Sequence, residues 1–113
     1  MLIAWTTTAE RTDADRLARG AVEARLAVCT QIDSPITSHY RWEGRLEQAT
    51  EHRIWFKYLR SNAAELMAWV HHHHPYRTPQ WIVVEAESVG EKYLSWAIAN
   101  STSPPFNDSE PSQ

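Results

Sequence analysis

Cysteine is nearly absent from this sequence, with one residue in 113, and that scarcity limits the chemistry available to a single chain. A lone thiol excludes a disulfide within the chain and a zinc site built mainly from thiolates. Glycine is also scarce, and Gly20, Gly44 and Gly90 are too scattered to build a phosphate-binding loop. Because the Gly-x-Ser-x-Gly nucleophile motif is missing as well, we do not expect an enzyme.

An excess of basic charge and a long hydrophobic run are also missing. Eleven Lys and Arg against fourteen Asp and Glu give a net charge of -3, whereas phosphate binding usually needs a clustered basic excess. The apolar start, Met1 to Trp5, is too short for a signal-peptide core or a membrane span. We therefore expect a cytoplasmic protein with neither nucleic acid nor membrane among its partners.

Tryptophan is the residue in excess, with six in a chain that otherwise has an ordinary composition for a soluble domain. The length suits one domain, which we assign to residues 1–100. Residues 101–113 hold three of the six prolines together with several serines. We expect this segment to be a disordered Pro/Ser-rich tail.

Hydrophobic periodicity predicts strands and helices in a definite order. A strand over residues 2–7 precedes an amphipathic helix over 12–26, with Thr12 as N-cap and Asp15 completing a capping box. Strand character over 28–40 is interrupted by Asp33-Ser34-Pro35, and after the turn Glu43-Gly44 it resumes over 46–59 as one long hairpin. Ser61 can cap a second helix that Pro75 must end, and a strand over 79–87 and a helix over 91–99 follow.

The order β-α-β-β-α-β with a terminal helix predicts an α+β, ferredoxin-like fold whose antiparallel sheet carries two helices on one face. The other face needs solvent or a partner. The hairpin carries more aromatic side chains than a monomer of this size would bury: Tyr40, Trp42, Trp55, Phe56 and Tyr58. We therefore expect a homo-oligomer.

Several segments, in this order along residues 2 to 99, resemble the CutA divalent-cation tolerance family. They are Thr6-Thr7, Leu17-Ala18, the run from Val22 to Cys29, Tyr40-Arg41-Trp42-Glu43-Gly44, Lys57, His74-Pro75-Tyr76, Pro79 and Tyr93-Leu94-Ser95-Trp96. The resemblance implies a tight homotrimer, similar in shape to the PII signalling proteins, in which the long hairpins cross between subunits. It also implies a link to tolerance of copper and other divalent metals.

Candidate metal ligands are Cys29, His74 and Glu87. A thiolate suits Cu(I), and a neutral imidazole suits Cu(II) or Zn(II), so Cys29 would need His74 or groups from a neighbouring subunit. The alternative is that Cys29 packs as a small apolar residue. The family has a carboxylate where this chain has Gln80, and the nearest substitutes are Glu85 and Glu87, which would share one face of the predicted strand.

Four consecutive histidines, His71 to His74, end the second predicted helix, and only His74 matches the family motif. Successive helical residues turn by about 100°, so four in a row do not converge on one ion. His71 and His74 could share a face. The alternative for His71 to His73 is an exposed helix end whose protonated side chains favour the C-terminal dipole.

The resemblance assigns five further residues to an inter-subunit cleft: Tyr40, Trp42, Lys57, Tyr76 and Trp96. A lysine among aromatic walls could receive a small anion or a carboxylate. Alternatively, the tryptophans are packing anchors and Lys57 is an ion-pair partner. Two functions follow: a metal-tolerance protein that binds copper or a similar divalent ion, or a PII-like scaffold whose cleft binds a small molecule or a protein.

Overall fold

The computed structural model describes residues 1–33 and 35–102. Its elements are β1 (Leu2–Thr8), α1 (Arg11–Glu23), β2 (Cys29–Ile32), β3 (Ile36–Trp42), β4 (Arg45–Tyr58), a 3-10 turn (Arg60–Asn62), α2 (Ala63–His73), β5 (Ile82–Glu85) and α3 (Glu91–Ala99). The predicted tail falls outside the described residues from position 103 onward. At its start, the Thr102 N–H donates to the Arg25 carbonyl at 3.0 Å, which joins this point to the end of α1.

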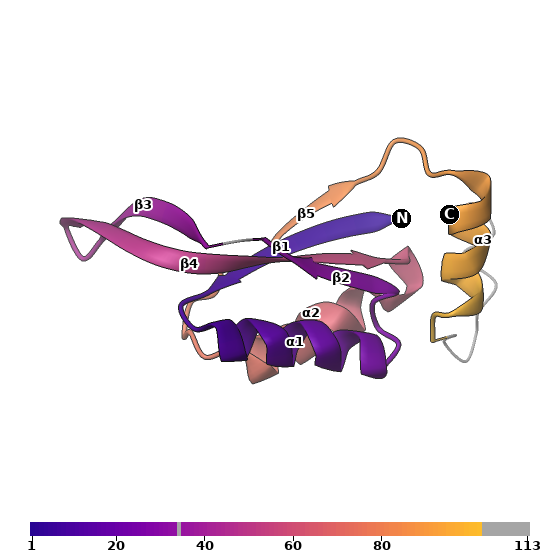
Figure 1. Ribbon diagram of the computed structural model, residues 1–113, viewed down its shortest axis with the longest axis horizontal. Coiled ribbons are helices and arrows are strands. Elements are labelled where there is room, and N and C mark those ends of the chain that lie inside the picture. Colours follow the sequence, from indigo (N-terminus) through magenta and orange to yellow (C-terminus); the bar gives the residue numbers. More distant parts are fainter. Residues whose placement is uncertain (34, 103–113) are drawn as a thin grey trace.

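The strands form an antiparallel sheet in the order β2-β4-β1-β5, and β3 pairs with the remaining half of β4. Helices α1 and α2 cover one face of the sheet, and α3 lies at one end (Figure 1). The mixed α+β class and the antiparallel sheet predicted from the sequence are therefore confirmed. No helix in the described part of the chain is long and apolar enough to cross a membrane.

The long hairpin projects from the body as an arm made of β3 and the first half of β4 (Figure 1). At its turn Glu43 and Gly44 have positive φ angles of 49° and 78°, as expected for a tight two-residue hairpin. The interruption before Ile36 is tied to β4, because the Asp33 carboxylate accepts hydrogen bonds from Arg53 Nε at 2.6 Å and Trp55 Nε1 at 2.8 Å. These bonds fix where β2 ends and the arm begins.

The main hydrophobic core lies between the sheet and the two helices that cover it. Its largest apolar side chains are fully buried: Leu17, Ile54, Phe56, Tyr58, Leu66 and Val70. A smaller cluster of Met1, Val28, Leu59 and Ala97 anchors α3 to the end of the sheet. The core is therefore one-sided, and it leaves the opposite face of the sheet uncovered by this chain.

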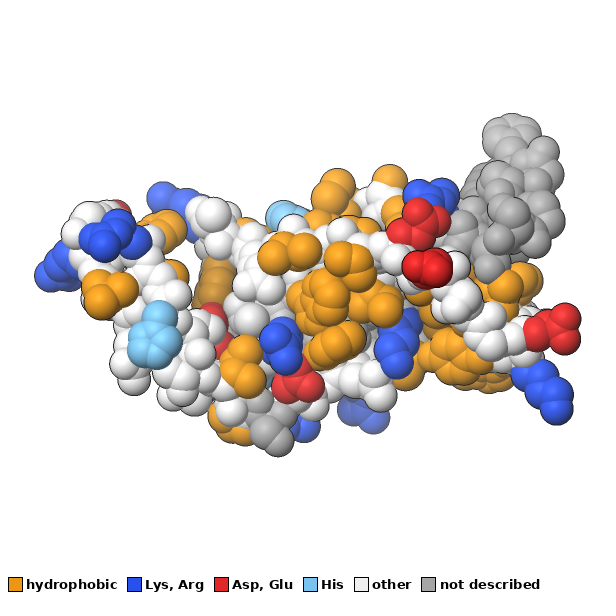
Figure 2. All heavy atoms as spheres, turned by 90° about the horizontal axis from the view of Figure 1, so that it is seen from above, with side chains coloured by type: hydrophobic (Ala, Val, Ile, Leu, Met, Phe, Trp, Pro, Cys, Tyr) orange, Lys and Arg blue, Asp and Glu red, His pale blue; other side chains and the backbone are white. Residues whose placement is uncertain are grey.

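That opposite face carries the side chains that alternate with the core residues. Trp5 pairs with both Trp55 and Ile82, and Ile3 pairs with Val84. Figure 2 looks onto this face, where hydrophobic side chains gather near the centre. Trp5 and Trp55 meet edge to face with ring centroids 4.9 Å apart.

Three local predictions are wrong. The N-cap of α1 is Glu10 rather than Thr12, because the Ala14 N–H already bonds the Glu10 carbonyl at 3.2 Å, so Thr12 lies inside the helix. It ends at Glu23, and Arg25 then takes a left-handed φ of 61° that turns the chain. Ser61 does not cap α2, since it lies within the 3-10 turn and Asn62 precedes the helix.

The last strand is also shorter than predicted. β5 spans Ile82–Glu85 rather than residues 79–87, and its four residues pair with Leu2 to Trp5 of β1. Glu87 therefore lies beyond the strand, in the connection to α3. Glu85 and Glu87 do not share a strand face.

Candidate functional site

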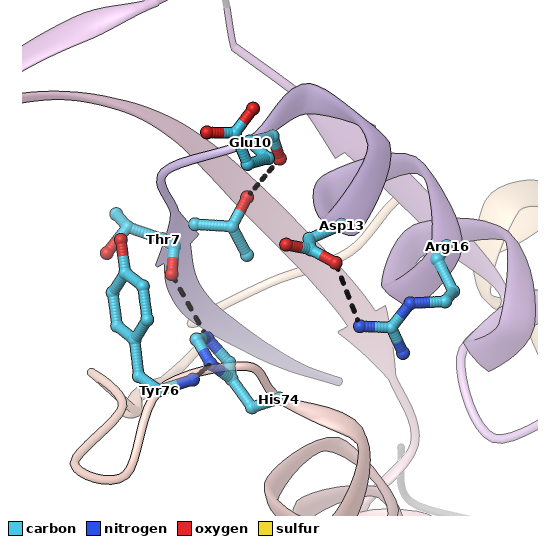
Figure 3. Close-up of polar contacts among 7 residues, drawn as sticks. Thr7, Glu10, Asp13, Arg16, His74 and Tyr76 are labelled. Atoms are coloured by element: carbon cyan, nitrogen blue, oxygen red, sulfur yellow. Dashed lines mark hydrogen bonds and ion pairs between the residues drawn. The ribbon is translucent and has the colours of Figure 1, made fainter.

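The end of α2 carries the most constrained side chain of the site. Pro75 disfavours a helical conformation in the residue before it, and His74 accordingly takes an extended conformation with ψ 138°. Its ring turns back against β1, where Nε2 lies 3.0 Å from the Thr7 carbonyl (Figure 3). The same nitrogen lies 3.0 Å from Thr6 Oγ1. On the other side of the ring, Nδ1 accepts the Tyr76 N–H at 3.0 Å.

These partners fix the protonation state of His74. A carbonyl only accepts and a backbone N–H only donates, so Nε2 carries the proton and Nδ1 does not. The side chain is buried, and burial lowers the pKa of His74, which keeps the ring neutral at pH 7. Both ring nitrogens are thus engaged, and a metal ion at His74 would have to displace one of these hydrogen bonds.

Tyr76 extends the same chain of contacts to the arm. Its hydroxyl donates to Glu51 Oε2 at 2.7 Å, and its ring lies 4.9 Å from the His74 ring between centroids. Burial, and secondarily the Glu51 carboxylate, raise the pKa of Tyr76, so the hydroxyl remains a proton donor well above neutral pH. Because Glu51 belongs to β4, the contact ties the α2–β5 connection to the base of the arm.

A pocket of about 610 Å³ opens beside this contact. Its walls come from β1, the arm and the α2–β5 connection: Thr7, Ser38, His39, Tyr40, Trp42, Glu51, Tyr76, Arg77, Thr78 and Gln80. Three of the five predicted cleft residues, Tyr40, Trp42 and Tyr76, therefore line one pocket. Gln80, the departure from the family pattern, lines the same space.

The other two predicted cleft residues lie elsewhere in the chain. Lys57 stands on β4 between Cys29 of β2 and Ile3 of β1. Trp96 lies on α3, 45% exposed, with its ring 5.4 Å from that of Tyr93. Within one chain, neither residue contributes to the pocket.

Cys29 lies at the α3 end of the sheet. It is half-buried at the start of β2 and packs against the cluster that anchors α3. Burial raises the pKa of Tyr93, and the Cys29 thiol beside the phenol adds to the shift, so the two groups are direct neighbours. Cys29 is therefore packed, as a small apolar residue would be, and still partly accessible, as a metal ligand would need to be.

Glu87 and His74 lie away from Cys29. Thr7, which holds His74, pairs with Arg53, whereas Cys29 pairs with Lys57, four residues or about 13 Å further along β4. Glu87 lines a separate cavity of about 210 Å³ beyond β5, where Glu85 is already ion-paired with Arg60. Among the described residues, no group of three or more His, Cys, Asp or Glu side chains could hold a metal ion.

The sequence reasoning missed Glu51, which joins the arm to Tyr76. Its partner, Tyr76, is 25 residues away in sequence. Only the pairing of Ile36 with Glu51 shows that Glu51 lies at the base of the arm. A buried carboxylate usually has a partner, and here the partner is the Tyr76 hydroxyl, but the burial itself is seen only in the structure. The strand alternation alone did not reveal that it would be buried.

Comparison with known proteins places the chain in a family. The model of the family described as CutA1 divalent ion tolerance protein matches residues 2–100. The divalent-cation tolerance protein CutA of Yersinia pestis (strain Pestoides F) is 34% identical over 94 residues, covering 83% of this chain and 79% of that protein.

Solved structures agree with this match. The crystal structure of CutA1 from the psychrotrophic bacterium Shewanella sp. SIB1 has a TM-score of 0.87 at 31% identity, covering 90% of this chain and 95% of that chain. The structure of CutA from Synechococcus elongatus PCC7942 has a TM-score of 0.86 at 33% identity, covering 89% of each chain. The chain therefore belongs to the CutA1 divalent ion tolerance family.

Proposed function

We propose that this protein acts in divalent-cation tolerance as a cytoplasmic homotrimer that binds copper or a similar divalent ion and catalyses no reaction. The family match over residues 2–100 is the observation that carries the proposal. It covers every helix and strand described above, and the relative from Yersinia pestis bears the name divalent-cation tolerance protein.

The uncovered face of the sheet supports an assembly of several copies. Ile82 and Val84 of β5 are 52% and 41% exposed, beside the half-buried Trp5 and Trp55. On the arm, Leu46 is 74% exposed. Apolar side chains gathered on the open face of β1, β4 and β5 favour burial against another protein surface, and further copies of the same chain can bury them symmetrically.

Cys29 is the soft donor of the proposed copper site. One thiolate per chain gives three per trimer. A single thiolate does not complete the coordination of a metal ion, and His74 and Glu87 of the same chain lie away from Cys29, so other groups must supply the remaining ligands. Donors from neighbouring copies or water would complete the coordination. His74 and Glu87 remain candidates in that role, and His74 would first have to give up a hydrogen bond.

A copper titration in a background without the exposed histidines tests this proposal. The parent variant carries His71→Ala, His72→Ala and His73→Ala, and the test variant adds Cys29→Ala. We expect the parent to bind copper and the Cys29→Ala variant to lose most of that affinity; equal affinity and stoichiometry in both would refute the assignment. Light scattering should give about three times the chain mass of 13.0 kDa, and a monomer would refute the trimer.

The pocket supports a second candidate function, a PII-like scaffold that binds a small molecule. Its volume of about 610 Å³ falls in the range of small-molecule sites, and Tyr40, Trp42 and Tyr76 supply aromatic walls. A metabolite screen on the metal-free protein should then reveal a ligand that raises the unfolding temperature by mass action. Trp42→Ala should abolish that shift, and a shift unaffected by this change would exclude the pocket as its origin.

A further inference from the structure

The histidine run at the end of α2 divides into side chains with different environments. We propose that His72 and His73 form a two-imidazole site for a divalent transition-metal cation of the Ni²⁺, Cu²⁺ and Zn²⁺ class. Their ring centroids lie 4.9 Å apart, with the ring planes at 82°. The site uses neither Cys29 nor the pocket and goes beyond the proposed function.

His73 is held in the form that binds metals. Its Nδ1 lies 2.8 Å from the Trp69 carbonyl, and because a carbonyl only accepts, Nδ1 carries the proton. The lone pair of the neutral ring is therefore on Nε2. A ligand histidine is typically oriented in this way, by a hydrogen bond from its other nitrogen to a carbonyl or carboxylate.

The His73 ring is also fixed by packing. It lies over the Trp69 indole, with centroids 4.4 Å apart and an interplanar angle of 32°. Trp69 in turn packs tightly on α1, where a Cβ added to Gly20 would lie 2.6 Å from Trp69 Cη2. The ring is thus ordered before any ion arrives, which reduces the entropy lost on binding.

The spacing of the two rings fits shared coordination. With metal–nitrogen bonds of about 2 Å, two imidazoles in neighbouring positions around one ion have ring centres roughly 4.5–5 Å apart. The separation between His72 and His73 falls within that range. The Cα–Cβ bonds of successive helical residues point about 100° apart, so the two rings come close only through the conformations of their side chains.

The flanking histidines do not share this arrangement. His71 donates from Nδ1 to the Met67 carbonyl at 2.8 Å, but its ring meets the edge of Trp81, with centroids 5.8 Å apart, rather than another histidine. His74 has both nitrogens engaged. The described residues offer no third protein donor, so water completes the coordination, as expected of a weak and exchangeable site.

Ni²⁺ titration by calorimetry tests the pair, with every protein carrying Cys29→Ser so that no thiolate contributes. We expect one Ni²⁺ per chain in the parent and a loss of affinity of about tenfold or more in His72→Ala and in His73→Ala, since each leaves a single donor. His71→Ala is the matched control, because it removes an imidazole with the same backbone hydrogen bond from the same exposed helix end. Its affinity should stay within about twofold of the parent.

A second measurement locates the ion directly. Ni²⁺ is paramagnetic, so the NMR ring signals of His72 and His73 should broaden at lower Ni²⁺ concentrations than those of His71. Conservative His72→Gln and His73→Gln variants, checked by circular dichroism, guard against a change in the helix end. The proposal is overturned if a variant carrying both His72→Ala and His73→Ala binds Ni²⁺ like the parent. It is also overturned if His71→Ala loses as much affinity as His72→Ala or His73→Ala. Failure of the Cys29 copper site leaves these results unchanged.

Discussion

Replacing Tyr76 with phenylalanine removes one hydroxyl and leaves Glu51 without its 2.7 Å hydrogen bond. The ring itself remains, so its contact with His74 is preserved. Glu51 is only 8% exposed, and the described residues give its carboxylate no ion-pair partner. The substitution therefore tests how much the contact between the arm and the α2–β5 connection contributes to stability.

The expected cost follows from the charge and burial of the acceptor. Hydrogen bonds to charged groups contribute about 1.5–3 kcal/mol, and an acceptor left unsatisfied in a buried position loses most of that. We expect Tyr76→Phe to lower the free energy of unfolding by about 2 kcal/mol. The measurement is guanidinium denaturation at pH 7 and one fixed protein concentration, because an oligomer's stability depends on concentration.

Tyr40→Phe is the matched control. Tyr40 lines the same pocket, is 44% exposed, and forms no hydrogen bond through its hydroxyl to the described residues. It should change the free energy of unfolding by less than about 0.5 kcal/mol. The reasoning fails if Tyr76→Phe costs no more than Tyr40→Phe. A Glu51→Gln variant completes a double-mutant cycle, whose coupling energy isolates the Tyr76–Glu51 pair.

Three further changes probe other parts of the fold. Burial lowers the pKa of His74, so below about pH 6.5 the unfolded chain binds more protons than the folded chain, and stability falls with acidification. His74→Asn should therefore weaken the dependence of the denaturation midpoint on pH between pH 7 and 5. Burial raises the pKa of Tyr58 to about 12, so above about pH 10 the unfolded chain releases this proton first and stability falls. Tyr58→Phe should reduce that loss in denaturation midpoints measured from about pH 9 to 11. Gly20→Ala places a Cβ 2.6 Å from Trp69. Overpacking costs about 1–3 kcal/mol, whereas alanine gains only about 1 kcal/mol over glycine in helix propensity, so we expect a lower unfolding temperature by calorimetry. Adding Trp69→Phe should restore part of that loss.

The order of elements could be predicted because its signals are local. The strand alternation, the Glu43-Gly44 turn and the proline stop after α2 each depend on a few adjacent residues. Element ends were less predictable. α1 starts without a side-chain cap, so Thr12 offered a signal that the helix does not use, and β5 extends only as far as β1 pairs with it.

The site was less predictable than the fold because its contacts span long sequence separations. The sequence indicated His74 through the proline after it, but nothing local indicated that its ring would bond Thr7, 67 residues away. The resemblance grouped Lys57 and Trp96 with the aromatic residues of the arm. In a single chain these two residues lie apart from that pocket, so their place in one cleft remains a prediction about the assembled protein.

The two proposed functions use opposite ends of the sheet and therefore need not exclude each other. Cys29 lies beside α3, whereas the pocket opens beside the arm. Helix α3 and the arm lie at opposite ends of the molecule (Figure 1). One strand, β4, carries both Lys57 opposite Cys29 and Glu51 in the pocket wall. If metal binding shifts β4, the affinity for a pocket ligand must change by the same factor as the ligand changes the affinity for metal, because coupling between sites is reciprocal. Equal ligand affinity with and without copper would instead show two independent sites on one scaffold.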